Sequence, residues 1–357
     1  MLERPDINTN IRNIAGFSAL KCAEQCNYSE IVNLFQNGDI NSQDNEGVTT
    51  LMRAVKSGDK ERVKQLLKQK NIDVNIKDND GITALTRAVM NNLKEITELL
   101  LNRKDIDVNI KDKTGCTALI WASQNGHKEM VELLLKHPKI DINIQDNYGF
   151  AALISAAQNG HEAVVALLLK EKEISVDKQD DKQSTALMWA AQNGHKTVVK
   201  LLLKHKDIAV NIQNDQEATA LILASENGRK EVVQLLLDHP DIDVHQQSKY
   251  KSTALMRAVS QNHIEVVDLL LEIPGIDVNH QDNNGFTALI CAAHCGYTEI
   301  VEMLLKHKGI NVNIASNLGN LTALMCASLQ GHEKIVEMLL NKPVLKLIFK
   351  IVMNSRH

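Results

Sequence analysis

Residues 108–141 read VNIKDKTGCTALIWASQNGHKEMVELLLKHPKID, and this stretch decides the fold because variants of it fill the chain. Its Thr-Ala-Leu motif recurs at a nearly constant interval, with first residues at Thr49, Thr83, Thr117, Ala151, Thr185, Thr219, Thr253, Thr287 and Thr322. Each interval is 34 residues except the last, which is 35, and a weaker copy begins at Ser18. A segment of this length cannot bury its own apolar face. The spacing therefore predicts a stack of ten similar repeats.

Each repeat contains the signals of two short helices. Residues 112–115, Asp-Lys-Thr-Gly, have turn chemistry and predict a tight hairpin or loop tip. Thr117 then precedes an apolar run and is expected to cap the first helix, because its hydroxyl can accept from the first turn's backbone donors. Gly126 is expected to end that helix in the left-handed conformation. A second helix is predicted over about 128–137, from apolar residues at helical spacing.

Comparison of the repeats with one another shows which positions are fixed. Nine of the ten repeats carry a hydroxyl at the cap position, and Ala151 is the exception. The position that ends the first helix holds only Gly or Asn: Asn27, Gly58, Asn92, Gly126, Gly160, Gly194, Gly228, Asn262, Gly296 and Gly331. Both residues tolerate the left-handed conformation, so this position is predicted to require it. Three consecutive repeats lose the turn Gly, and there Gln183, Glu217 and Lys251 predict a different turn.

The pattern Asp-x-x-Gly-x-Thr-Ala-Leu, followed by Asn-Gly-His-x-Glu-x-Val-x-Leu-Leu-Leu and Val-Asn, resembles the ankyrin repeat from about Asp6 to Pro343. The resemblance implies an all-α repeat fold, a solenoid of helix-turn-helix repeats with projecting β-hairpin or loop fingers and a protein-binding concave groove. We expect one domain over residues 6–343. Its approximate repeats are 6–39, 40–73, 74–107, 108–141, 142–175, 176–209, 210–243, 244–277, 278–311 and 312–343.

Composition narrows the class of partner. The 40 basic and 44 acidic residues are scattered and leave a formal charge of −4, so no basic stripe suited to nucleic acid is present. The six Cys have no disulfide-framework spacing, the N-terminus has no secretory signal pattern, and no apolar stretch is long enough to cross a bilayer. We therefore expect a monomer in the cytoplasm or another intracellular compartment, with a secreted effector as the alternative.

Candidate binding residues are those that differ between repeats, since repeating residues are explained by stacking. One first-helix position varies widely: Cys22, Arg53, Arg87, Trp121, Ser155, Trp189, Leu223, Arg257, Cys291 and Cys326. By the resemblance this face lines the groove, and Trp and Arg are the residue types that most often anchor interfaces. The candidates here are Arg53, Arg87, Trp121, Trp189 and Arg257. The alternative for the two Trp is that they fill space between adjacent repeats.

Aromatic residues near the finger tips form a second set of candidates. They are Tyr148, Phe150, Tyr250 and Phe286, and exposed aromatics on loop tips are typical of contact surfaces. Scattered surface apolar residues are also normal in proteins without a partner, so the alternative is that they have no role.

Reactive residue types do not form a recognisable site in the sequence. The His of Asn-Gly-His recurs at His127, His161, His195 and His332, which indicates a repeated structural hydrogen bond. The pairs Cys22/Cys26 and Cys291/Cys295 sit four residues apart on one predicted helix, but zinc needs four converging ligands. No phosphate loop, dinucleotide fingerprint or nucleophile elbow occurs. We expect no cofactor, no metal and no catalytic residue.

The sequence therefore favours a non-enzymatic scaffold that binds a protein or peptide through the groove and the finger tips. The alternative function is the targeting arm of a host-directed effector or of a ubiquitin-ligase substrate adaptor. Residues 344–357 form an apolar and basic tail, which we expect to fold back as a cap. Contact with a partner or with a membrane surface are the alternatives for this tail.

Overall fold

The computed structural model describes residues 11–14, 16–26 and 40–341. The chain divides into two compact units, Met1–Asp181 and Lys182–His357, and each is described here by itself. That the repeats form one domain stays a prediction. No helix in the described ranges is both long and apolar enough to cross a bilayer.

Both units consist of short helices in pairs, as the repeat pattern predicts. The helices of the first unit are α1 (Ala19–Gln25), α3 (Thr50–Lys56), α4 (Lys60–Leu67), α5 (Ala84–Met90), α6 (Lys94–Leu101), α7 (Ala118–Gln124), α8 (Lys128–Leu135), α9 (Ala152–Gln158) and α10 (Glu162–Leu168). Those of the second unit are α11 (Ala186–Asn193), α12 (Lys196–Leu202), α13 (Ala220–Glu226), α14 (Lys230–Leu237), α15 (Ala254–Ser260), α16 (Ile264–Leu271), α17 (Ala288–Cys295), α18 (Thr298–Lys306), α19 (Ala323–Gln330) and α20 (Glu333–Leu340).

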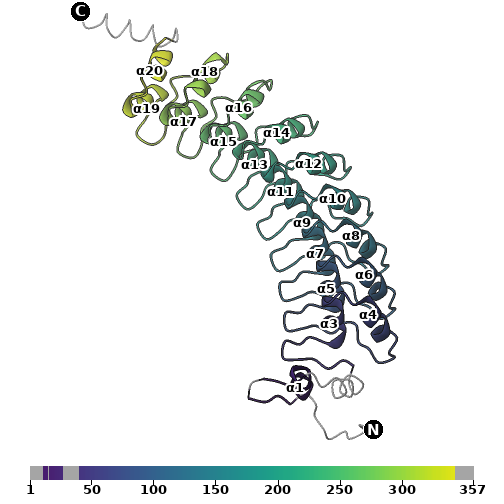
Figure 1. Ribbon diagram of the computed structural model, residues 1–357. Helices are drawn as coiled ribbons and strands as arrows, with labels where there is room; N and C mark the ends of the chain where they lie inside the picture. The colour runs from purple at the N-terminus through teal and green to yellow at the C-terminus, as the bar shows by residue number, and fades with distance from the viewer. Residues whose placement is uncertain (1–10, 15, 27–39, 342–357) are drawn as a thin grey trace, which may run out of the picture. The chain divides into compact units, whose positions relative to one another are not determined.

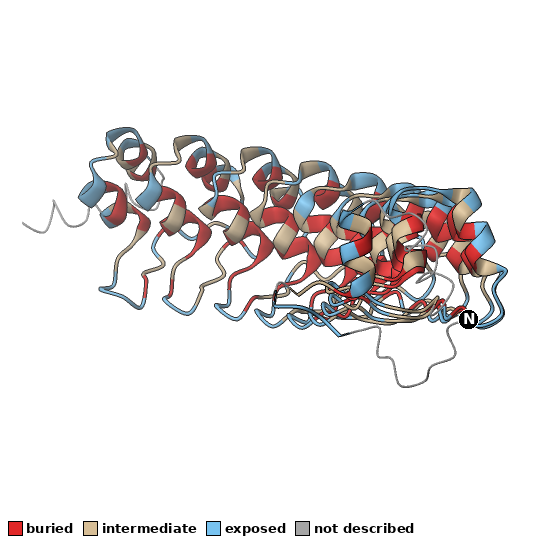
Figure 2. Ribbon diagram, turned by 60° about the horizontal axis from the view of Figure 1, so that its bottom comes forward, coloured by how far each residue is buried: buried red, intermediate tan, exposed pale blue. Residues whose placement is uncertain are grey.

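The helices of each unit form two layers. From α3 onward, the odd-numbered helices are the first helices of their repeats and pack against one another, and the even-numbered second helices form the other layer (Figure 1). The loops that precede the first helices project from the first layer as fingers. Small and branched apolar residues such as Ala122, Leu134 and Val165 are fully buried. Buried positions occur on the helices of both layers (Figure 2). The core is therefore a series of thin layers shared between neighbouring repeats.

The predicted hydroxyl caps are present. The Oγ1 atom of Thr117 accepts a hydrogen bond from the backbone N–H of Ile120 at 3.3 Å, and the same bond is made by Ser18 and by the Thr of the other repeats. Ala151 begins α9 with the same extended backbone but has no side-chain cap. One donor of the first turn of α9 therefore lacks the partner it has in the other first helices.

The predicted left-handed residue ends every first helix from α3 to α19. The φ angles of these Gly and Asn residues are all positive, from 54° at Asn92 to 80° at Gly194. Asn27, the first member of the series, lies outside the described residues. The restriction to Gly and Asn therefore has a backbone cause.

The fingers are loops more than β-hairpins. Among the residues described, no strand forms, and only four isolated bridges occur: Arg12↔Ser18, Gln43↔Thr49, Gln145↔Ala151 and Ala315↔Thr322. In most repeats a side chain holds the turn instead, although Ser248 makes no such bond in its turn. The Oδ1 atom of Asp112 accepts from the backbone N–H groups of Thr114 and Cys116 at 2.8 and 3.0 Å. Adjacent fingers are then linked by bonds such as Asn147 N–H to the Thr114 carbonyl at 2.9 Å.

The expectation of a different turn in three repeats is wrong. Gln183, Glu217 and Lys251 keep the left-handed conformation, with φ of 58°, 55° and 57°. The N–H of Glu217 donates to the carbonyl of Asn214 at 2.8 Å, just as the N–H of Gly115 donates to that of Asp112 at 3.0 Å. The side chain of Asn214 also bonds the backbone of this turn, at 3.0 Å to both Gln216 and Ala218. These surrounding bonds fix the turn even where the Gly is replaced.

Candidate protein-binding face

The variable position of the first helices lies where each helix meets its finger. We call the side chains at this position the helix-one face; from α3 to α17 they are Arg53, Arg87, Trp121, Ser155, Trp189, Leu223, Arg257 and Cys291. Ser155 is buried and the others are half-buried. Each half-buried side chain therefore contacts its own repeat and keeps part of its surface accessible.

The face residues are tied to the fingers by a repeated polar contact. In three repeats the partner is an Asp nine residues earlier. The Nε1–H of Trp121 donates to Oδ2 of Asp112 at 2.8 Å. An Nη2 atom of Arg53 donates to Oδ2 of Asp44 at 3.0 Å, and Arg87 forms the corresponding ion pair with Asp78. The face residue therefore braces the first helix against the finger.

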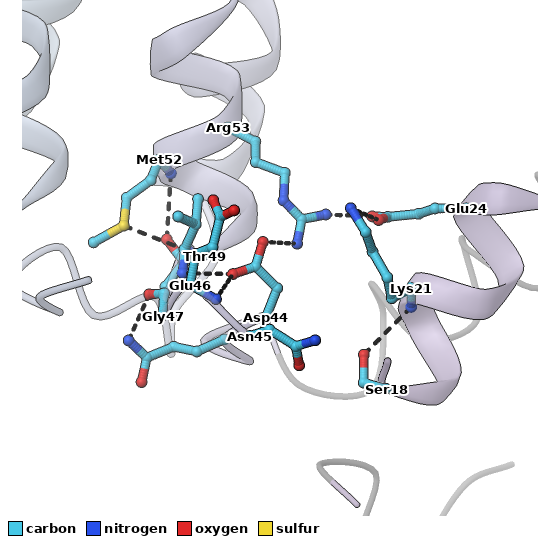
Figure 3. Close-up of polar contacts among 12 residues, drawn as sticks. Ser18, Lys21, Glu24, Asp44, Asn45, Glu46, Gly47, Thr49, Met52 and Arg53 are labelled. Atoms are coloured by element: carbon cyan, nitrogen blue, oxygen red, sulfur yellow. Dashed lines mark hydrogen bonds and ion pairs between the residues drawn. The ribbon is translucent and has the colours of Figure 1, made fainter. Parts of the chain in front are cut away.

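Figure 3 shows how one Asp, Asp44, holds both the turn of its finger and the face residue Arg53. Oδ1 of Asp44 accepts from the backbone N–H groups of Glu46 and Val48, both at 2.9 Å, and so holds the turn. Its Oδ2 accepts from Arg53, which also pairs with Glu24 of the preceding repeat. The sequence interpretation missed this brace. The signal that identifies it is an Asp followed nine residues later by Arg or Trp.

These contacts bear on the two interpretations of the Trp residues. Trp121 is half-buried and its polar edge is bonded to its own finger, so it is neither a free anchor nor a fully enclosed packing residue. Trp189 occupies the same position in the second unit and is also half-buried. Partial burial fits packing between repeats, and the remaining accessible surface of each residue fits contact with a partner.

Arg257 departs from the pattern. The residue nine positions earlier is Ser248 in place of Asp, so this Arg has no finger carboxylate. Its Nη1 contacts Oε1 of Glu226 at 3.4 Å, and its guanidinium lies 5.8 Å from the centroid of the Tyr250 ring. Arg257 is therefore braced against an aromatic ring and the preceding repeat.

The finger aromatics divide into two pairs. Tyr148 and Tyr250 are exposed, with relative accessibilities of 68% and 54%. Phe150 and Phe286, which were expected to be exposed at the tips, are half-buried, and their backbone N–H groups donate to Oδ1 of Asp146 and Asp282 at 2.8 Å. They lie at the base of the turn, where the chain returns toward the first helix. Of these four aromatic residues, the two Tyr therefore expose the larger fraction of their surface.

The recurring His residues make the predicted structural bonds. A ring nitrogen of His127 bonds the carbonyl of Val89 at 3.0 Å, and His161 bonds that of Gln124 at 2.9 Å. His332 bonds the carbonyl of His294 at 3.2 Å. Each bond joins the start of a second helix to the end of the preceding repeat's first helix. These His therefore hold neighbouring repeats together.

A second link between repeats was not recognised in the sequence. The Nδ2 of Asn109 donates to the carbonyl of Lys139 at 2.7 Å, while its Oδ1 accepts from the N–H of Asp141 at 3.0 Å. Asn41, Asn75, Asn143 and Asn211 make the same pair of bonds with the next repeat. The Val-Asn of the repeat motif is therefore an inter-repeat clamp.

The thiols of Cys116, which is buried, and of Cys291, which is half-buried, are poorly suited to nucleophilic chemistry. Burial raises the pKa of Cys116 to about 11 and that of Cys291 to about 12, so both are protonated thiols at neutral pH. Within the described ranges, no group of three or more His, Cys, Asp or Glu is placed to hold a metal ion.

A family model for ankyrin repeats, built of three copies, matches residues 19–112, 104–180, 172–248 and 255–347, which is most of the chain. The chain belongs to the ankyrin repeat family. It is also similar to the crystal structure of EF0377, an ankyrin repeat protein, with 30% identity and a TM-score of 0.52. That match covers 56% of this chain and 98% of the other. A search of curated proteins found no match.

Ankyrin repeats are in general protein–protein interaction modules. The helix-one face of this ankyrin repeat protein varies between repeats, while the caps, stops and clamps around that face repeat. Arg53, Arg87, Trp121, Trp189 and Arg257 lie on this face, and Tyr148 and Tyr250 lie at finger tips.

Proposed function

We propose that this ankyrin repeat protein is a non-enzymatic scaffold that binds a protein or peptide through the helix-one face and the exposed finger tips. The observation that carries the proposal is the contrast between neighbouring positions. In α7, for example, Leu119 and Ala122 are buried and fixed by packing, whereas Trp121 between them is partly accessible. An accessible position whose chemistry changes from repeat to repeat, on a rigid support, is suited to recognition.

The residue types at these positions support the same function. Trp, Tyr and Arg supply large contact areas and directional polar groups, and they are enriched in the residues that dominate binding energy. The braces to Asp44, Asp78 and Asp112 hold three of these side chains in one orientation before a partner arrives. Preorganised side chains lose less conformational entropy on binding.

Site-specific photo-crosslinking tests the proposal. A benzophenone amino acid is placed at Tyr148 or Tyr250, and matched controls carry it at Glu129 or Glu162, which are exposed on second helices. We expect the finger positions to give a discrete crosslinked protein, identified by mass spectrometry, and the second-helix positions to give none. Equal crosslinking at both sets of positions would contradict the proposed surface.

A further inference from the structure

The repeat that contains Arg257 has lost the acid that its finger would otherwise supply. Ser248 takes the place held by Asp44, Asp78 and Asp112 in earlier repeats, and in the part of the chain described its buried Oγ has no hydrogen-bond partner. The Ser hydroxyl carries no charge. Arg257 is therefore the face residue of this repeat without a carboxylate from its own finger.

The remaining contacts of Arg257 leave donors unused. A guanidinium has five N–H groups, and the contact with Glu226 is long for a hydrogen bond, at 3.4 Å. The Nε of Arg257 is buried and makes no hydrogen bond among the described residues. About a quarter of the side chain is accessible, at 25%. An incoming anion can therefore reach a guanidinium that is only partly paired.

The finger beside Arg257 adds positive charge and an aromatic surface. Lys249 and Lys251 are exposed on either side of Tyr250, whose ring lies against the guanidinium. The finger before it carries Asp215 and Glu217, and the finger after it carries Asp282, Asn283 and Asn284. Of these three neighbouring fingers, only the one beside Arg257 carries Lys.

We propose that Arg257, Tyr250, Lys249 and Lys251 form a site for a carboxylate side chain in an acidic segment of a protein partner. The carboxylate accepts hydrogen bonds from the accessible part of the Arg257 guanidinium, which has no finger Asp to pair with in this repeat, and the Tyr250 ring keeps the guanidinium oriented. The two Lys attract neighbouring acidic residues. This inference rests on the proposed function and names the chemistry of its partner.

The local charges favour a carboxylate over a phosphate. Glu226 contacts the same guanidinium, and its charge repels an incoming dianion more strongly than an incoming monoanion. A nucleic acid would need basic side chains along several fingers, and the acidic and neutral neighbours of this finger do not supply them.

A binding assay tests the site with a fluorescent peptide that carries a short run of Glu and a matched peptide that carries Gln. We expect the parent protein to bind only the Glu peptide, with affinity that falls as salt rises. Arg257→Gln should weaken binding at least about tenfold, as expected when one partner of a hydrogen-bonded charge pair is removed. Lys206→Gln removes the same charge from an exposed site, 86% accessible, and should change affinity less than about twofold.

The more specific test restores the missing acid. Ser248→Asp should pair with Arg257, raise the melting temperature and weaken binding of the Glu peptide at least about tenfold. Circular dichroism confirms that each variant is folded. If the parent fails to distinguish the two peptides, or if folded Arg257→Gln and Ser248→Asp bind like the parent, the inference is overturned. Tighter binding of a phosphoserine peptide than of the Glu peptide would overturn the choice of carboxylate.

The proposed function is judged separately. Crosslinks at Tyr148 together with unchanged peptide affinity in the Arg257 variants would remove the acidic-peptide site and leave the scaffold function intact. Absence of crosslinks at both finger positions, with peptide binding that follows the predictions for Arg257, would remove the proposed scaffold surface and leave the acidic-peptide site intact.

Discussion

At the residue scale, α9 differs from the other described first helices of the repeats because it lacks a hydroxyl cap. Ala151 has the same extended backbone and the same burial as the capping Thr residues. Ala151→Thr should therefore stabilise the protein by about 1 kcal/mol, because the new hydroxyl bonds an unpartnered donor in the first turn. Urea unfolding measures the change. The reverse substitution, Thr117→Ala, is the control and should cost about as much; an unchanged midpoint for Ala151→Thr would argue against the cap.

Glu217 provides a second test at this scale, since it holds a left-handed conformation that its side chain disfavours. Glu217→Gly should stabilise the protein by about 1 kcal/mol through relief of that strain. Gly115→Ala is the matched control and should destabilise it, because the added Cβ would lie 2.6 Å from the backbone N of Asn147. A neutral or destabilising Glu217→Gly, measured by thermal unfolding, would show that the turn tolerates Glu without strain.

The sequence predicted the caps and stops well because ten copies within one chain expose what is constant. It failed at Gln183, Glu217 and Lys251 because the identity of one residue was taken to decide a turn. The structure shows that neighbouring bonds decide it, including those from Asn214. Local propensity was overridden by the surrounding contacts.

At the element scale, the brace between finger and first helix links stability to recognition. Trp121→Ala should destabilise the protein by about 2 kcal/mol, less than the ~3 to 5 kcal/mol of a fully buried Trp, because the ring is half-buried. Trp121→Phe keeps most of the ring and removes the bond to Asp112, and should cost about 1 kcal/mol.

Affinity for a partner identified by crosslinking distinguishes the two interpretations of Trp121, contact with the partner and packing between repeats. If Trp121 contacts the partner, Trp121→Ala weakens binding by about 2 kcal/mol or more under conditions in which the variant is folded. Trp189→Ala is the corresponding variant in the second unit. A folded Trp121→Ala protein with parental affinity would remove Trp121 from the binding face.

The Asn clamps, which join neighbouring repeats, give another prediction at this scale. His245 stands where most other repeats have the clamp Asn, and in the described part of the chain its ring makes neither clamp bond. His245→Asn should stabilise the second unit by about 1 kcal/mol, while Asn109→Ala should cost about 1 to 2 kcal/mol for the loss of two bonds. Urea unfolding of both variants measures the contribution of the clamp to the free energy of unfolding. Periodicity alone did not reveal it, because its partners are backbone groups that any residue supplies.

At the scale of the whole molecule, the last described repeat differs from those before it. Met325 is 50% accessible, whereas Ile290, its equivalent one repeat earlier, is 1% accessible because α19 packs against α17. Leu321, Leu324, Met325 and Leu329 line a shallow apolar hollow on this repeat. An apolar surface of this kind is normally covered in a repeat protein, because terminal repeats need a polar outer face.

We expect the apolar tail, residues 344–357, to cover this surface, as its sequence suggests; these residues lie outside those described. Met325→Glu in the full chain should then destabilise the protein by about 1 to 3 kcal/mol, because the tail would bury a polar group without a partner. After deletion of 344–357 the same substitution should be nearly neutral, since Glu would face water. The deletion alone should increase binding of a hydrophobic dye, and Met325→Glu should reverse part of that increase. If Met325→Glu is neutral in the full chain, the tail does not cover this surface, and contact with a partner or a membrane becomes the better account of its apolar residues.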